Sequence, residues 1–164
     1  MAGRLGAKRV VASDYPSETV LGPLRDNLQR GMVHRVAAQR VTVQGHAWGA
    51  LDDDLSTRDR HAFDRVMAAD VLWMPWQHDN LRRSVDHFLA RDGEARAWII
   101  GALHTGRANM ALFLDHEELR GLGLEVEHIW ERHCHGAERE WKQVREDDDG
   151  NRKRWLVIIV LKRT

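Results

Sequence analysis

Val10-Val11-Ala12-Ser13-Asp14-Tyr15-Pro16 is the stretch that decides the fold, because a short apolar run ends there on an acid, an aromatic residue and a proline. Such an uninterrupted apolar run is typical of a buried strand in a parallel sheet, where both faces are covered. Pro16 lacks a backbone N–H and therefore ends the strand. Apolar residues at helical spacing follow over 18–32, so we expect Asp14 on a turn between a strand and a helix. Ligands of open α/β sheets bind at this edge, and a carboxylate there suits a pair of ribose hydroxyls.

The rest of the chain continues this alternation of strands and helices. Further strands are predicted at 40–45, 63–69, 95–103, 125–131 and 154–162, and helices at 76–90 and 108–122. The last two strands are joined through a charged segment that ends in a turn at Asp147-Asp148-Asp149-Gly150. The pattern predicts an α/β fold: a Rossmann-like, doubly wound, mostly parallel sheet with an antiparallel C-terminal hairpin, in a single domain over 1–164.

Composition limits the function classes. The 164 residues hold 25 Lys and Arg against 25 Asp and Glu, and this zero net charge argues against a nucleic-acid partner or a membrane-surface role. The single cysteine, Cys134, excludes an internal disulfide and suits a reducing compartment, so we expect a cytoplasmic protein. No apolar run reaches the length of a transmembrane helix, and the first residues lack the apolar core of a signal peptide.

Three motifs at strand ends carry a resemblance to a known family. The stretch at 10–16, His46-Ala47-Trp48-Gly49 and Ala69-Asp70-Val71-Leu72-Trp73 together resemble successive motifs of the class I S-adenosylmethionine-dependent methyltransferases. The likeness is to the lysine methyltransferases and the fungal nicotinamide N-methyltransferase-like proteins. Leu103-His104-Thr105-Gly106-Arg107 and the segment 129–141 resemble fungal members of this group.

The resemblance implies S-adenosyl-L-methionine as cofactor and a protein lysine, a protein N-terminus or a small amine such as nicotinamide as methyl acceptor. Asp14 would then hold the ribose hydroxyls beside Tyr15, Trp48 would lie against the adenine, and Ala69 would bring its backbone close to the cofactor. The family's acid-x-x-aromatic motif falls on Asp70 and Trp73, where tryptophan replaces the usual tyrosine or phenylalanine.

The same resemblance implies which residues line the entrance for the methyl acceptor. The acceptor amine must also lose a proton, so a base is needed. Trp73 and Trp76 are the expected acceptor contacts, and Asp70 or His104 is the candidate base for the acceptor amine. Three of the candidate site residues also have a purely structural interpretation. Asp14 can simply start a helix, Trp48 can be core packing, and Asp70 can cap the loop before Pro75.

One part of the family pattern is absent before Asp14. The family has a first strand and a glycine-rich turn for the methionine part of the cofactor, whereas Gly3 and Gly6 lie where the following helix would finish. By this resemblance we expect an N-terminally truncated fold that lacks a strand between those ending at Asp14 and Asp70. The sheet would then close across the gap, be completed by a partner or by self-association, or keep an exposed edge. The alternative function is a catalytically inactive, truncated fold that acts as an interaction module.

The ten histidines raise the question of a metal site. The densest group contains His128, His133, Cys134 and His135. Neighbouring residues in an extended segment point to opposite faces, so three adjacent ligands seldom converge on one ion. No metal site is expected.

Overall fold

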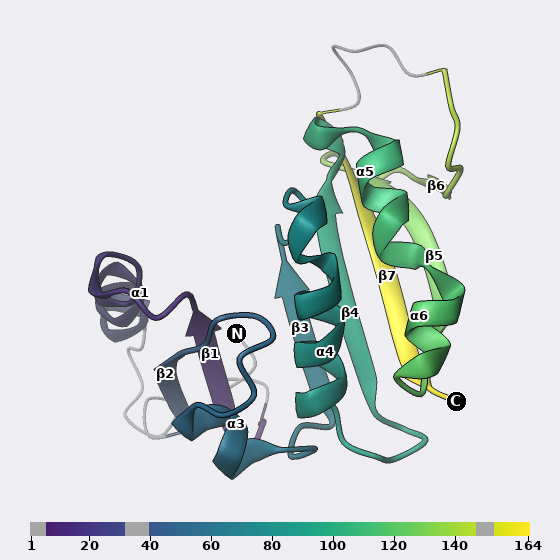
Figure 1. Ribbon diagram of the computed structural model, residues 1–164. Coiled ribbons are helices and arrows are strands. Elements are labelled where there is room, and N and C mark those ends of the chain that lie inside the picture. The colour runs from purple at the N-terminus through teal and green to yellow at the C-terminus, as the bar shows by residue number, and fades with distance from the viewer. Residues whose placement is uncertain (1–5, 32–39, 147–152) are drawn as a thin grey trace. The chain divides into compact units, whose positions relative to one another are not determined.

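The structure, a computed structural model, describes residues 6–31, 40–146 and 153–164 (Figure 1). The chain divides into two compact units, Met1–Arg58 and Asp59–Thr164, and each is described by itself. No helix among the described residues has both the length and the apolar character needed to cross a membrane.

The first unit contains a two-stranded parallel sheet. Strand β1 (Val10–Asp14) leads into helix α1 (Glu18–Gly31), and strand β2 (Val41–Gly45) is followed by helix α3 (Asp54–Asp59). The register of the two strands runs from Val10 opposite Val41 to Asp14 opposite Gly45. Both predicted strands and the helix between them are therefore confirmed. Helix α3 was not predicted, because its six residues are mostly polar and give no apolar spacing.

The second unit contains a five-stranded mixed sheet in the order β3-β4-β7-β5-β6. Its elements are β3 (Arg65–Ala69), η2 (Pro75–Gln77), α4 (His78–Phe88), β4 (Arg96–Ala102), η3 (Leu103–Thr105), α5 (Arg107–Ala111), η4 (Leu112–Leu114), α6 (His116–Gly121), β5 (Leu124–His133), β6 (Glu138–Glu140) and β7 (Trp155–Arg163). Strands β3 and β4 are parallel, whereas β7 is antiparallel to both β4 and β5. The predicted antiparallel C-terminal pair is confirmed. The turn predicted at 147–150 lies outside the described residues.

Helices α4, α5 and α6 lie over one face of this sheet (Figure 1). Residues of β4 alternate between buried and half-buried, so Ala97 and Ile99 belong to a fully buried row together with Ile159 of β7. Apolar side chains of the helical segments complete this core: Leu81, Val85, Phe113 and Leu119. Their burial provides most of the driving force for folding of the unit.

Two local features of the second unit differ from the expectation. The single helix predicted over 108–122 is instead divided into α5, η4 and α6, because Asp115 begins a new helix by accepting hydrogen bonds from the backbone N–H groups of Glu117 and Glu118. Strand β6 was not predicted, since Glu138-Arg139-Glu140 carries no apolar signal and forms a strand through its pairing with β5.

Within the described ranges, the two sheets are separate and β3 is an edge strand of its sheet. The strand that the resemblance implies to be missing would pair at such an edge, and its absence stays a prediction. Parallel pairing occurs only between β1 and β2 and between β3 and β4, so the described strands are mixed rather than mostly parallel.

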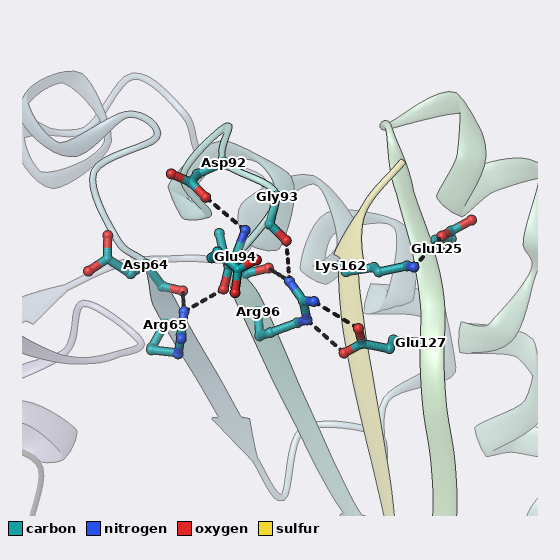
Figure 2. Close-up of polar contacts among 10 residues, drawn as sticks. Asp64, Arg65, Asp92, Gly93, Glu94, Arg96, Glu125, Glu127 and Lys162 are labelled. Carbon is teal, nitrogen blue, oxygen red and sulfur yellow. Dashed lines mark hydrogen bonds and ion pairs between the residues drawn. The ribbon is translucent and has the colours of Figure 1, made fainter.

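The amino ends of β3 and β4 are joined by polar contacts (Figure 2). Arg96 donates two hydrogen bonds to the carboxylate of Glu127, at 2.6 and 2.8 Å, and thereby connects β4 to β5 across β7. These bonds hold the pKa of Glu127 below its ordinary value. Lys162 of β7 pairs with Glu125 of β5 at 3.1 Å. This edge therefore has a structural role, and the candidate chemistry lies at the opposite, carboxyl edge.

Candidate functional site

In the first unit, the candidate residues lie at the carboxyl ends of two paired parallel strands. The carbonyl oxygen of Asp14 accepts a hydrogen bond from the N–H of His46 at 2.8 Å, so the turn after β2 begins level with the end of β1. The Asp14 side chain is exposed, and its Oδ1 accepts the N–H of Tyr15 at 2.7 Å. Among the described residues its second oxygen has no partner, which fits a carboxylate that receives ligand hydroxyls.

Tyr15 and Trp48 differ in exposure. Tyr15 is 64% exposed, whereas Trp48 is half-buried in the turn that follows β2. A half-buried indole after a strand end offers a flat apolar surface to a planar ligand. The predicted roles of Asp14, Tyr15 and Trp48 in cofactor binding remain proposals.

The turn that carries Trp48 is fixed by a buried polar cluster that sequence reasoning missed. His46 is buried, and its Nδ1 lies 2.8 Å from Oδ2 of Asp53 and 3.4 Å from Oγ of Ser56. Ser56 also donates its hydroxyl to the carbonyl oxygen of Ala50 at 3.1 Å. The cluster closes the loop between β2 and α3, which carries Trp48.

Hydrogen bonds within this cluster stabilise the charged form of Asp53. Burial raises the pKa of Asp53, but hydrogen bonds from Ser56 and His46 outweigh burial and hold that pKa below its ordinary value. Asp53 Oδ1 accepts the N–H of Ser56 at 2.7 Å, which is the bond of a helix N-cap. The sequence does carry a signal for this N-cap, because Asp53 is an acid that directly precedes the helix and lies three residues before Ser56. Ser56 and Asp53 both face the same ring nitrogen of His46, so the arrangement is not that of a nucleophile activated by a histidine base.

In the second unit, Ala69 and Asp70 end β3 with a strained backbone. Asp70 has a φ of +58°, in the left-handed region that only glycine, asparagine and aspartate adopt readily. Its N–H donates to the carbonyl oxygen of Ile100 at 2.8 Å, which carries the β3–β4 pairing one residue beyond the strand. The Asp70 carboxylate is exposed and has no partner among the described residues. Strained acids of this kind are frequent at functional sites.

The loop after Asp70 presents two tryptophans and is anchored beneath them. Trp73 is 46% exposed and Trp76 is 71% exposed, whereas Leu72 between them and the strand is buried. Leu72 packs against Gly101 of β4, where an added Cβ would lie 3.1 Å from the Leu72 Cβ. The loop thus passes close to the end of β4, and both tryptophans are exposed.

A buried histidine is hydrogen-bonded to the same loop. His78, 2% exposed, lies with Nε2 at 3.2 Å from the carbonyl oxygen of Leu72, so Nε2 carries the proton and donates it. Burial and the nearby charge of Arg82 hold the pKa of His78 below its ordinary value, although the bond to Leu72 opposes them. His78 is therefore a neutral support of the tryptophan loop.

The backbone places His104 in η3, directly after β4. Because β3 and β4 are parallel, His104 and Asp70 follow strand ends at the same edge of the sheet. The His104 side chain lies outside the described parts of the structure, so its role as a base remains a proposal.

A buried carboxylate lies close to this edge and was missed by sequence reasoning. Glu131 of β5 is fully buried and accepts hydrogen bonds from Arg107 Nη2 at 2.8 Å and from Arg139 Nε at 2.7 Å. Burial alone would raise the pKa of Glu131, but the two guanidinium groups hold it below its ordinary value. Arg107 also faces the ring of Trp141 at 5.2 Å. The network attaches the segment after β6 to α5 and has a structural role.

Comparison with known proteins shows which sequences and structures the chain is similar to. No family model matches the chain. The chain is 30% identical to a protein N-terminal and lysine N-methyltransferase, EFM7, of Candida glabrata over 97 residues, which are 58% of this chain and 38% of that protein. It is 30% identical to EFM7 of Eremothecium gossypii over 116 residues, covering 61% and 43% of the two chains. With EFM7 of Kluyveromyces lactis the identity is 23% over 172 residues, covering 91% and 58%. The chain thus spans about half the length of these relatives.

Solved structures show the fold. A SAM-dependent methyltransferase from Methanosarcina mazei superposes with a TM-score of 0.61 at 9% identity, covering 99% of this chain and 84% of the other. The methyltransferase domain of a bacterial Hen1 protein superposes with a TM-score of 0.58 at 10% identity, covering 94% and 77%. The chain therefore has the fold of the S-adenosylmethionine-dependent methyltransferases, and its sequence is similar to part of the protein N-terminal and lysine N-methyltransferases EFM7.

Proposed function

We propose that this chain forms part of an S-adenosylmethionine-dependent N-methyltransferase that acts on a lysine side chain or an N-terminal amine of a protein. The observation that carries the proposal is the strand edge of the first unit, where Asp14 and Trp48 follow two paired parallel strands whose ends are level. The names of the sequence relatives support the acceptor class.

The cofactor supplies an electrophilic methyl group when it is bound. In the first unit, Asp14 has an oxygen available for the ribose hydroxyls, Tyr15 lies exposed beside it, and Trp48 offers an indole surface for the adenine. In the second unit, Ala69 is small enough for its backbone to approach a ligand. These residues fit a nucleoside-containing cofactor in residue type and exposure.

The chain's own chemical task is to position the amine and remove its proton. An alkylammonium group is unreactive until it loses a proton, and the exposed carboxylate of Asp70 is our candidate acceptor for it. His104, after the neighbouring parallel strand, is the second candidate. Trp73 and Trp76 offer exposed aromatic surface to a polypeptide and to the cationic amine it presents.

The test is methyl transfer by the full chain to peptides. One peptide carries a free N-terminus and no lysine, a second carries lysine and an acetylated N-terminus, and nicotinamide represents the small amines. Formation of S-adenosylhomocysteine with either peptide, lost in Asp14→Ala, supports the proposal. Transfer only to nicotinamide would contradict the acceptor class, and cofactor binding without any transfer would favour the inactive interaction module.

The compartment and the domain organisation complete the proposal. The single cysteine supports a reducing compartment such as the cytoplasm. We also propose that 1–164 folds as a single domain. One cooperative thermal transition, shifted as a whole by a substitution in either unit, is the expected result, and two independent transitions would contradict it.

A further inference from the structure

Three consecutive side chains with metal-binding atoms come together where β5 ends. One ligand atom each from His133, Cys134 and His135 lies within 4.8 Å of the other two. The expectation that three neighbours diverge assumed an extended segment. The chain instead turns there, because the N–H of Gly136 donates to the carbonyl oxygen of His133 at 2.8 Å and Gly136 has a φ of +92°.

The backbone around these side chains is held in place by the sheet. The N–H of His133 donates to the carbonyl oxygen of Ala137 at 2.7 Å, and the N–H of Cys134 donates to that of Arg154 at 2.9 Å. The His133 ring packs edge-on against Trp155, with 4.9 Å between centroids. Two of the three ligands therefore start from backbone that is already ordered, which lowers the entropy cost of closing a site.

The spacing of the ligand atoms is close to that of a metal centre. Tetrahedral Zn²⁺ holds sulfur at about 2.3 Å and nitrogen at about 2.0–2.1 Å, which places neighbouring ligand atoms roughly 3.3–3.6 Å apart. The Sγ of Cys134 already lies 3.9 Å from Nδ1 of His133. The rings of His133 and His135 are 5.2 Å apart between centroids. The three ligand atoms thus lie within about 1.5 Å of the separations that a tetrahedral ion requires.

Exposure favours access by an ion. Cys134 and His135 are exposed and His133 is half-buried, so an ion can enter from solvent and keep water in its remaining position. Two imidazoles and one thiolate form a donor set suited to Zn²⁺ and unsuited to Mg²⁺ or Ca²⁺, which prefer oxygen.

We propose that His133, Cys134 and His135 form a three-ligand site for Zn²⁺ at the turn between β5 and β6. The thiol proton of Cys134 leaves to solvent on binding, and no electron is transferred. The proposal does not depend on the proposed methyl transfer, because every ligand and anchoring contact lies within the second unit.

The experiment uses the reduced, full chain without an affinity tag and Co²⁺ as a spectroscopic substitute for Zn²⁺. We expect one Co²⁺ per chain, a thiolate-to-cobalt charge-transfer band in the near ultraviolet, and displacement of Co²⁺ by Zn²⁺. Cys134→Ser should abolish that band. His135→Ala should weaken Zn²⁺ binding by more than about tenfold, the least that loss of even an outer-shell partner commonly costs.

His128→Ala is the matched control, because His128 is an exposed histidine on the same strand outside the cluster. It should leave the titration unchanged, and circular dichroism should show that all three variants are folded. A missing charge-transfer band, a band that persists in Cys134→Ser, or one Co²⁺ shared by two chains would overturn the proposal. None of these results bears on cofactor binding, which is measured separately.

Discussion

Asp14 lies directly opposite Gly45 in the parallel pair of β1 and β2, and the absence of a side chain on Gly45 lets the chain beyond Asp14 pass close to it. A Cβ on Gly45 would lie 2.8 Å from the Cβ of Pro16 and 3.0 Å from its Cα. The position of the candidate ribose-binding acid therefore depends on a glycine in the neighbouring strand.

Gly45→Ala should displace Pro16 and, with it, the turn that holds Asp14. Because the obstructing atoms include backbone, we expect a loss of about 1–3 kcal/mol in the free energy of unfolding, as for other overpacked sites. Urea unfolding measures this loss. Gly22→Ala in α1 is the control, because an added Cβ there meets only the flexible end of Glu18 at 3.5 Å. Equal stability of the two variants would contradict the close approach.

Asp70 allows its charge and its backbone to be tested separately. Asp70→Asn keeps a residue that tolerates a φ of +58°, so stability should change little while methyl-transfer turnover falls by roughly 10²–10⁴-fold if Asp70 accepts the proton. Asp70→Ala should lose the same turnover and also about 1–2 kcal/mol of stability from backbone strain. Full turnover in Asp70→Asn would remove Asp70 from proton transfer and leave His104 as the candidate.

Glu131→Gln should destabilise the second unit by about 3 kcal/mol or more, because it leaves the charges of Arg107 and Arg139 without their anionic partner. Chemical denaturation near neutral pH gives the value. Glu125→Gln is the matched control: its ion pair with Lys162 is partly exposed, so the change should stay within about 0.5 kcal/mol. A loss at Glu131 no larger than at Glu125 would show that the buried network contributes little.

His78 should make the stability of the tryptophan loop sensitive to acid. Its pKa is lower in the folded chain than the unfolded value of 6.5, so the unfolded state binds the additional proton first. Its contribution is fully present above pH 6.5 and is lost as the pH falls from there toward the folded pKa. Urea unfolding at neutral and mildly acidic pH should show this loss in the native chain and a smaller one in His78→Gln. An unchanged pH difference in the variant would exclude His78 as a source.

The sequence allowed the elements with a strong apolar pattern to be predicted. Val10–Ala12, Val41 and Val43, and the run from Ala97 to Ile100 are strands, since burial in a sheet requires such patterns. Strand β6 could not be found in this way, because its residues are all charged and its pairing with β5 is a tertiary effect. The break at Asp115 left a signal, an acid at a helix start followed by two glutamates, but the surrounding apolar spacing concealed it.

The candidate site likewise contains residues whose positions the sequence predicts and residues whose positions it does not. The strand-end positions of Asp14, Ala69 and Asp70 follow from the sequence, because apolar runs stop there. The contacts of His46 with Asp53 and of His78 with the carbonyl oxygen of Leu72 could not be predicted, because each joins residues six or seven positions apart across a turn. The convergence of His133, Cys134 and His135 likewise depends on the turn at Gly136. This turn lies beyond the end of the strand that the sequence predicts at 125–131.

Calorimetric titration of the full chain with S-adenosylmethionine tests the central claim most directly, with Asp14→Ala beside it and Asp26→Ala, an exposed acid of α1, as control. We predict a measurable heat of binding in the native chain and in Asp26→Ala, with an affinity at least about tenfold lower in Asp14→Ala, a loss of roughly 1.4 kcal/mol. Absence of binding in the native chain at millimolar ligand, or equal affinity in all three proteins, would contradict the account.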